Sequence, residues 1–178
     1  MTRVLYSTDS ALVALVEFVL MYYLSPMVAN SAPVLVRGRT LIDGGRLFPD
    51  GRPVFGSHKT WEGFLAGVVM GFTSSCTVGL VFESLPLTFL NMGGVVAALL
   101  GDLGGAFVKR RLGIEPGEPL PVVDQLDFAL AATLLYLLLD AGFASRLDLV
   151  VMSLLIILVL HLLTNNVAFV LGLKNKRW

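Results

Sequence analysis

Five long apolar segments dominate the sequence and lie at residues 10–32, 61–82, 87–108, 125–143 and 147–173. Each has close to the roughly 20 residues that a helix needs to cross a bilayer. Backbone polar groups inside a membrane must be satisfied within the segment, as they are in a helix. Only 15% of the 178 residues are charged, against about 25% in soluble domains. We therefore expect one all-α, polytopic membrane domain over residues 1–178, with five transmembrane helices.

Lysine and arginine are divided unequally between the two sides of such a bundle. Of the 13 basic residues, all but Arg3 and Arg146 lie in the long connections 33–60 and 109–124 or in the C-terminal tail. The positive-inside rule therefore predicts that both long loops and the C-terminus face the cytoplasm, with the N-terminus outside the cell membrane. The formal net charge is zero, which argues against a nucleic acid as a partner.

Three aspartates stand out against this apolar background. Asp102 lies well inside the third segment, where a carboxylate costs roughly 2.5–3.5 kcal/mol and is usually functional. Asp124 and Asp127 open the fourth segment, and their spacing of three puts both on one face of the helix. Oxygen ligands of this kind suit Mg²⁺, which keeps several waters and shares substrate phosphates. The alternative for the pair is that it only complements the positive N-terminus of its helix.

Basic residues follow Asp102 toward the predicted cytoplasmic side. Lys109 comes seven residues later, on the same helical face and roughly 10 Å nearer the cytoplasm, and Arg110 and Arg111 extend the cluster. Their position between the aspartates favours a role in binding phosphate, although a topology signal alone is an equally simple explanation.

The first long loop and the start of the second segment combine glycine with charge in the same way. Glycines allow close backbone approach to an anion, and free amides at a helix N-terminus attract phosphate. No Walker or dinucleotide-binding fingerprint is present, so a nucleotide site here is of another type. The candidate substrate-binding residues are Arg46, Arg52, Ser57, Lys59, Thr60 and Glu62, with Gly101 and Arg110 on the third helix.

Two blocks of residues resemble the signature of the CTP:phosphatidate cytidylyltransferase superfamily. One is Lys59-Thr60-Trp61-x-Gly63, and the other is Gly101-Asp102-Leu103, Lys109-Arg110 and Asp124-x-x-Asp127. Three further stretches are similar to the archaeal branch of that superfamily, the CDP-archaeol synthases: Asn30-Ser31-Ala32-Pro33, Asp50-Gly51-Arg52 and His161-x-x-Thr164-Asn165. The resemblance extends from Asn30 to Trp178.

The resemblance implies a Mg²⁺-dependent transfer of CMP from CTP to an isoprenoid ether-lipid phosphate, 2,3-bis-O-geranylgeranylglyceryl phosphate, in a membrane. It implies that Asp102, Asp124 and Asp127 bind the metal and that Lys109 and Arg110 bind phosphate, with Lys59 and Thr60 assisting.

Two alternatives stay open from the sequence. Glu115-Pro116 and Gln125 depart from the bacterial pattern, which disfavours a CDP-diacylglycerol synthase acting on phosphatidate. An ion-coupled transporter would use Glu17, Asp102 and Asp140 as a relay, but no inverted repeat typical of that class is visible.

Overall fold

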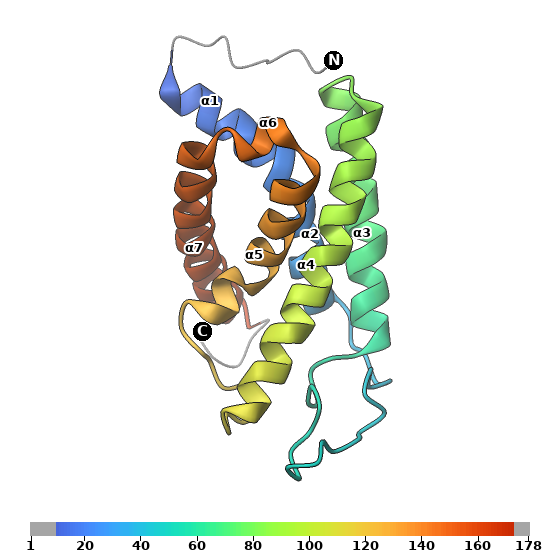
Figure 1. Cartoon of the computed structure of the whole chain (residues 1–178). Helices are drawn as coiled ribbons and strands as arrows, with labels where there is room; N and C mark the ends of the chain where they lie inside the picture. The colour runs from blue at the N-terminus through green and yellow to red at the C-terminus, as the bar shows by residue number, and fades with distance from the viewer. Residues whose placement is uncertain (1–9, 173–178) are drawn as a thin grey trace.

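The computed structural model describes residues 10–172, and this part of the chain is helical between irregular loops (Figure 1). Its elements are α1 (Ala11–Phe18), a π-helical turn η1 (Val19–Tyr23), α2 (Leu24–Ser31), a 3₁₀ turn η2 (Ala32–Leu35), α3 (Trp61–Val81), α4 (Leu85–Arg111), α5 (Val123–Leu139), α6 (Ala141–Ala144) and α7 (Leu147–Val170). Four stretches are long and apolar enough to cross a membrane, namely Ala11–Leu35, α3, α4 and α7. The predicted all-helical membrane architecture is thereby confirmed.

The predicted fourth segment is shorter than expected. We expected one helix over residues 125–143, whereas α5 ends at Leu139 and Asp140 adopts an extended backbone. The Asp140 carboxylate then accepts hydrogen bonds from the N–H groups of Gly142 and Phe143 and caps the short helix α6. An aspartate in an extended conformation is a favourable N-cap, so the helix breaks there. The last predicted segment forms α7, and its predicted end at residue 173 lies outside the described residues.

Pro26 explains why the first apolar segment is not one regular helix. Proline has no N–H to donate and its ring crowds the carbonyl four residues earlier, and the π-helical turn η1 lies immediately before this position. The side-chain amide of Asn91 on α4 donates to the main-chain oxygen of Met21 at 2.9 Å. Tyr136 on α5 donates to Asn91 in turn. The irregular turn is therefore held by a buried polar network.

Aromatic side chains fill the core where α1, η1, α5 and α6 meet. Phe18 stacks on Phe143 with ring centroids 5.2 Å apart, and Tyr22 meets the same ring edge-on. Tyr23 and Tyr136 are fully buried beside them, and the hydroxyl of Tyr23 shares a hydrogen bond with Thr133.

Glycines on α3 allow it to lie very close to α2 and α4. A Cβ at Gly67 would come within 2.7 Å of Leu99 and 2.9 Å of the oxygen of Ala29, and one at Gly71 would meet Val95 at 2.7 Å. Such small-residue contacts are the usual way in which membrane helices pack. The glycines at these two positions therefore allow the close packing of α3 against α2 and α4.

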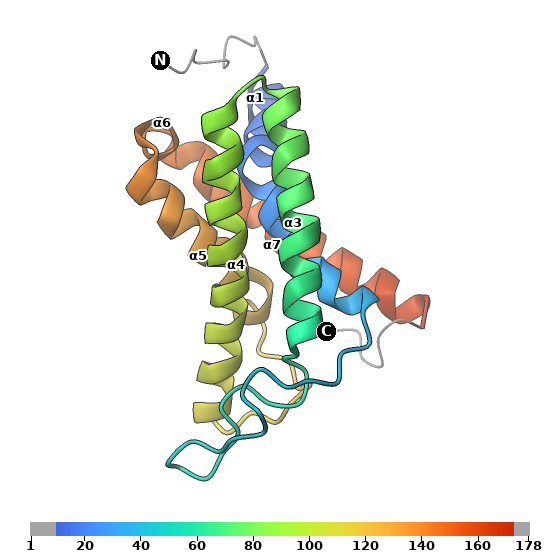
Figure 2. The same ribbon diagram turned by 90° about the vertical axis from the view of Figure 1, so that its right-hand side faces the viewer.

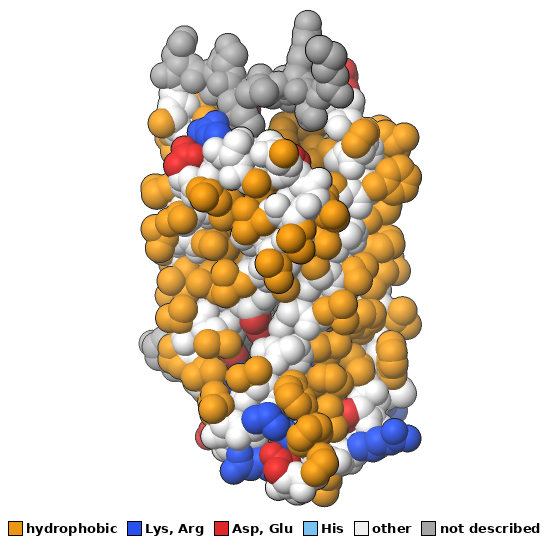
Figure 3. Space-filling model, viewed as in Figure 1, with side chains coloured by type: hydrophobic (Ala, Val, Ile, Leu, Met, Phe, Trp, Pro, Cys, Tyr) orange, Lys and Arg blue, Asp and Glu red, His pale blue; other side chains and the backbone are white. Residues whose placement is uncertain are grey.

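Both long loops lie at the same end of the bundle. The loop between η2 and α3 and the loop between α4 and α5 lie at the end of the bundle where α3 begins and α4 ends, while α6 and the α3–α4 turn lie at the opposite end (Figures 1 and 2). The basic residues between 10 and 172 gather at the loop end, with Arg146 as the exception, and apolar side chains cover the face between the two ends (Figure 3). Most of the basic side chains between residues 10 and 172 therefore lie at one end of an apolar bundle.

Candidate active site

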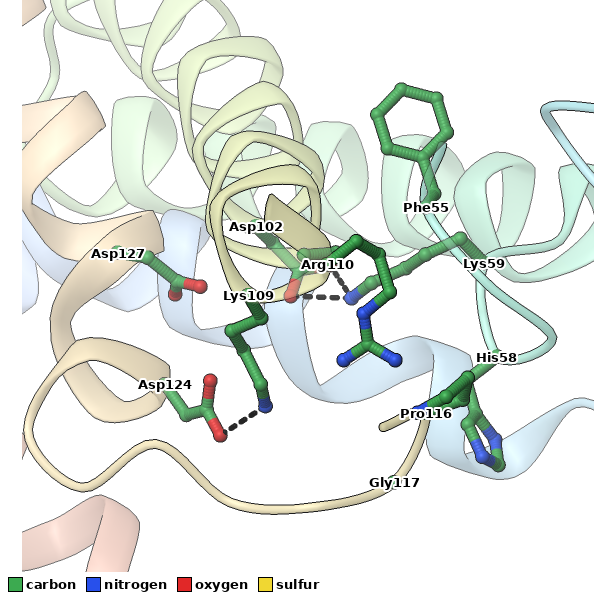
Figure 4. A pocket seen from close by; sticks show the side chains of 11 residues that line it. Phe55, His58, Lys59, Asp102, Lys109, Arg110, Pro116, Gly117, Asp124 and Asp127 are labelled. Carbon is green, nitrogen blue, oxygen red and sulfur yellow. Dashed lines mark hydrogen bonds and ion pairs between the residues drawn. The ribbon is translucent and has the colours of Figure 1, made fainter. Parts of the chain in front are cut away.

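A charged cavity of about 190 Å³ opens at the loop end, where α4, α5 and the two loops converge (Figure 4). Its acidic and basic lining residues come from segments far apart in the sequence. The lining comprises Phe55, His58, Lys59, Asp102, Ala106, Lys109, Arg110, Pro116, Gly117, Asp124 and Asp127. All four predicted catalytic residues, together with Lys59 and Arg110, therefore share one cavity.

Lys59 reaches from the end of the first loop to Asp102 on α4. Its Nζ lies 2.6 Å from each oxygen of the carboxylate. Both side chains are about a quarter exposed, so the aspartate inside the third apolar segment has a counter-ion.

Lys109 forms a second ion pair across the cavity, with Asp124 at the start of α5. Its Nζ lies 2.6 Å from Oδ2 of Asp124, and the same oxygen accepts the N–H of Leu120 at 2.8 Å. Val122, between them, has φ +70°, a conformation that is a genuine outlier for a β-branched residue. Backbone strain of this kind concentrates at functional sites, and it could not be predicted from the sequence.

Asp127 completes the acidic set and has no ion-pair partner within the part of the chain that the structure describes. Its Oδ1 accepts the N–H of Phe128 at 2.7 Å. Its other oxygen lies directly over Gly105 of α4, and the main chain of Asp127 lies over Gly101, where an added Cβ would come within 2.6 Å of the carbonyl oxygen. Gly101, predicted as a substrate-binding residue, therefore forms part of the α4–α5 contact beside the cavity.

Arg110 supplies an unusual positive charge to the cavity. The residue is only 4% exposed, and its Nε and Nη1 have no hydrogen-bond partner among residues 10–172. A buried, unsatisfied charge is costly, so the site is built for an anionic ligand. Gly56 (φ +99°) and Pro116 pack beside the guanidinium, with Nη1 3.6 Å from a Cβ placed on the glycine.

The neighbouring Arg111 points away from the cavity and fastens the first loop to α4. Its guanidinium lies over the rings of Phe48 and Phe107, at 4.5 and 5.0 Å from their centroids. It also pairs with Asp50 at 2.8 Å and donates to the oxygen of Pro53 at 2.6 Å. The sequence places Arg111 in the basic cluster, but of the two arginines only Arg110 is a predicted phosphate ligand, and the structure agrees with that difference.

Arg52, a predicted substrate ligand, also connects the loop to α4. Its Nη1 donates to the main-chain oxygens of Arg110 and Arg111 at 3.3 and 2.7 Å. The last carbonyls of a helix lack the usual intrahelical partners, and a cation is favourable there. Arg52 thus caps α4.

A network around Asp43 shapes the rest of the first loop. Its carboxylate accepts the N–H groups of Gly45, Phe55 and Gly56. Partial burial alone would raise the pKa of Asp43, but these donors outweigh it and hold the pKa below its ordinary value. The network positions Phe55, which lines the cavity, and it was not expected from the sequence.

The remaining predicted ligands lie around the cavity or away from it. Thr60 caps α3 by accepting the N–H of Gly63, and Glu62 accepts from the N–H and hydroxyl of Thr40. Both hold the loop where it enters α3. Arg46 and Ser57 are exposed and do not line the cavity.

The three aspartates fit a magnesium ion in the way that this metal usually binds. Mg²⁺ takes one or two carboxylates together with waters and substrate phosphates, so it does not need an all-protein cage. Asp102, Asp124 and Asp127 face one cavity (Figure 4), although no group of three acidic or histidine side chains in residues 10–172 is arranged to enclose an ion.

An all-helical membrane bundle with this charged cavity at one end defines an intramembrane enzyme that handles phosphorylated substrates. The CarS-like CDP-archaeol synthase family matches residues 12–178, and the chain belongs to that family. A CDP-archaeol synthase of Staphylothermus marinus is 52% identical over 160 residues, covering 89% of this chain and 91% of the relative. A second, from Aeropyrum pernix, is 41% identical over 155 residues, covering 87% and 88%.

A solved structure supports the same assignment. It is described as an intramembrane enzyme for archaeal membrane lipids biosynthesis, and it matches with a TM-score of 0.76 and 37% identity over 85% of this chain and 94% of that one. The resemblance seen in the sequence is thus confirmed, and with it the class of cytidylyltransferase. The transporter alternative is not favoured: Asp140 caps α6 and accepts from Tyr22, at the other end of α5 from Asp124.

Proposed function

We propose that this chain transfers CMP from CTP to 2,3-bis-O-geranylgeranylglyceryl phosphate, forming unsaturated CDP-archaeol and pyrophosphate. The observation that carries the proposal is the buried, unsatisfied guanidinium of Arg110 beside Lys59 and Lys109, opposite three carboxylates in one cavity. Such a site suits a polyphosphate with a divalent cation, and the family to which the chain belongs is named for this lipid product.

In the proposed reaction, an oxygen of the lipid phosphate attacks the α-phosphorus of CTP. The new P–O bond forms as the bond from the α-phosphorus to the bridging oxygen breaks, and pyrophosphate carries away the electron pair. A phosphomonoester has a second pKa near 6, so at neutral pH the nucleophile is mainly a dianion and needs no protein base. Arg110, Lys109 and Lys59 reduce the repulsion between the two anionic substrates and hold them in line.

We assign Asp102, Asp124 and Asp127 to Mg²⁺ in the loaded enzyme. When bound, the ion neutralises charge that develops on the phosphates and orients them. Before the ion binds, the carboxylates of Asp102 and Asp124 orient the lysines, because each ion pair fixes one ammonium at the cavity wall.

We further propose that α5 is the fifth membrane-embedded helix, with both long loops in the cytoplasm. Its 17 residues extend about 25 Å, slightly less than the roughly 30 Å hydrocarbon core. Its N-terminus would then lie at the cytoplasmic boundary, where CTP has access. The two isoprenoid chains of the substrate would lie between helices, open to lipid.

The direct test uses purified protein in detergent with CTP, Mg²⁺ and one candidate lipid phosphate at a time. We expect pyrophosphate release and a CDP-lipid with the isoprenoid ether phosphate, and much less with phosphatidate. Asp127→Asn should lose most of this activity while the protein remains folded. Asp148→Asn is the matched control, since Asp148 pairs with Arg146 at the other end of the bundle. Equal turnover of both lipids would contradict the substrate assignment, and no CDP-lipid from either would contradict the reaction.

A further inference from the structure

Two of the three aspartates in the cavity are paired with lysines. Lys59 places its ammonium on both oxygens of Asp102, and Lys109 places its ammonium on Asp124 (Figure 4). Oδ2 of Asp124 also accepts the N–H of Leu120, so one oxygen of this carboxylate carries both contacts. Only Asp127 has no cation partner in the described part of the chain. A divalent ion entering alone would therefore meet two carboxylates that are already neutralised.

An ammonium that already neutralises a carboxylate weakens the attraction of that carboxylate for a divalent cation. Mg²⁺ binds carboxylate oxygens at about 2.0–2.1 Å, whereas each ammonium lies 2.6 Å from the same atoms. The two positive charges would repel each other strongly in a site whose lysine side chains are only 23% and 11% exposed. Lys59 contacts both oxygens of Asp102 and must move before a metal binds there. Lys109, in contrast, contacts only Oδ2 of Asp124 and opposes the metal through its charge. A leaving ammonium needs another acceptor, and phosphate oxygens supply it.

We propose that Lys59 and Lys109 are resident counter-ions that exclude a free divalent cation, so that metal enters only together with a phosphate-bearing ligand. The lysine side chain suits this exchange, because it is a point charge on a long flexible stem that does not demand one bonding geometry. The proposal rests on the proposed use of Mg²⁺ and a nucleotide at this site. Arg110 differs from both lysines, since it lines the same cavity but forms no salt bridge with a carboxylate among residues 10–172.

The test measures binding of Mn²⁺ alone to the purified, nucleotide-free protein by equilibrium dialysis. Mn²⁺ suits the same oxygen ligands. Lys59→Gln should bind Mn²⁺ at least about tenfold more tightly than the unmodified protein, which is the scale on which groups behind the metal ligands act. Lys109→Gln should behave in the same way and provides a second variant should one fail to fold. Lys59→Arg, which keeps a cation on Asp102, should bind as weakly as the unmodified protein.

The matched control is Arg110→Gln, which removes the same charge from the same cavity but frees no carboxylate. Its Mn²⁺ affinity should stay within about threefold of that of the unmodified protein. If Arg110→Gln gained as much affinity as Lys59→Gln, the gain would come from the change in net charge alone, and the proposal would be overturned. Unchanged affinity in both folded lysine variants would also overturn it. These measurements contain no nucleotide or lipid, so their result is independent of whether CMP transfer to an ether lipid is observed.

Discussion

Gly105 of α4 lies directly beneath the carboxylate of Asp127 on α5, so that a Cβ at Gly105 would collide with Oδ2. The two helices meet at this point, and Gly101, one turn earlier, lies under the main chain of Asp127. The position of one cavity carboxylate therefore depends on the absence of a side chain on another helix.

Gly105→Ala should displace Asp127 and reduce CMP transfer by about two orders of magnitude, the cost of shifting a catalytic group by roughly 1 Å. Gly104→Ala is the matched control, because a Cβ at Gly104 meets nothing within 4 Å. Initial rates and size-exclusion profiles of both variants in detergent provide the measurement. Equal rates in the two variants would mean that the exact position of Asp127 does not matter.

The membrane helices could be predicted because their signal is local. Length and continuous apolar character are enough to identify a spanning helix, and the helices that cross the longest apolar runs begin and end within a few residues of the predicted limits. The break at Asp140 could not be predicted in this way, because an aspartate inside an apolar run does not show whether it will cap a new helix.

The cavity could be predicted only in part, because its charges depend on how the loops fold. Asp102, Asp124 and Asp127 were found from the cost of a buried carboxylate and from helical spacing. The pairing of Asp102 with Lys59, 43 positions away in the sequence, depends on the path of the first loop. Neighbouring residues on a helix point about 100° apart, so of Arg110 and Arg111 one enters the cavity and the other faces the loop.

Arg111→Ala should loosen the first loop, because the substitution removes the contacts with Phe48 and Phe107 and the ion pair with Asp50. We expect faster proteolysis within residues 46–58 and a rise of about tenfold in KM for CTP, with a smaller change in kcat. The prediction follows from loss of a positioned loop rather than of a catalytic group. Arg111→Lys should recover part of the effect through Asp50.

Arg37→Ala is the control, because Arg37 is exposed in the first loop and its replacement removes an equal charge without touching the contacts of Arg111. If Arg37→Ala raised KM for CTP as much as Arg111→Ala, the effect would come from the loss of positive charge near the site and not from the loss of the contacts between Arg111 and the first loop.

The orientation of the bundle can be tested with single cysteines after replacement of Cys76, which is exposed. A cysteine at Arg46, in the exposed part of the first loop, should react with an impermeant maleimide only from the cytoplasmic side. A cysteine at Ser145, next to α6 at the opposite end, should react only from outside. Reaction of Arg46→Cys from outside would place the cavity in the wrong compartment for CTP.

The pH dependence of the reaction tests which group supplies the nucleophile. If the lipid phosphate attacks as a dianion, the rate should fall as pH drops through its second pKa, near 6, and should reach a plateau above it. His58 lines the cavity and is the described side chain best placed to act as a base instead. His161 packs against Phe128 on the other face of α5, with centroids 6.0 Å apart, and does not line the cavity.

We expect His58→Ala and His161→Ala to keep the acidic limb, whatever they cost in binding or packing. Initial rates at saturating CTP and Mg²⁺ across pH 5 to 8 provide the measurement. Loss of the acidic limb together with catalysis in His58→Ala, but not in His161→Ala, would reveal a histidine base and contradict the dianion mechanism.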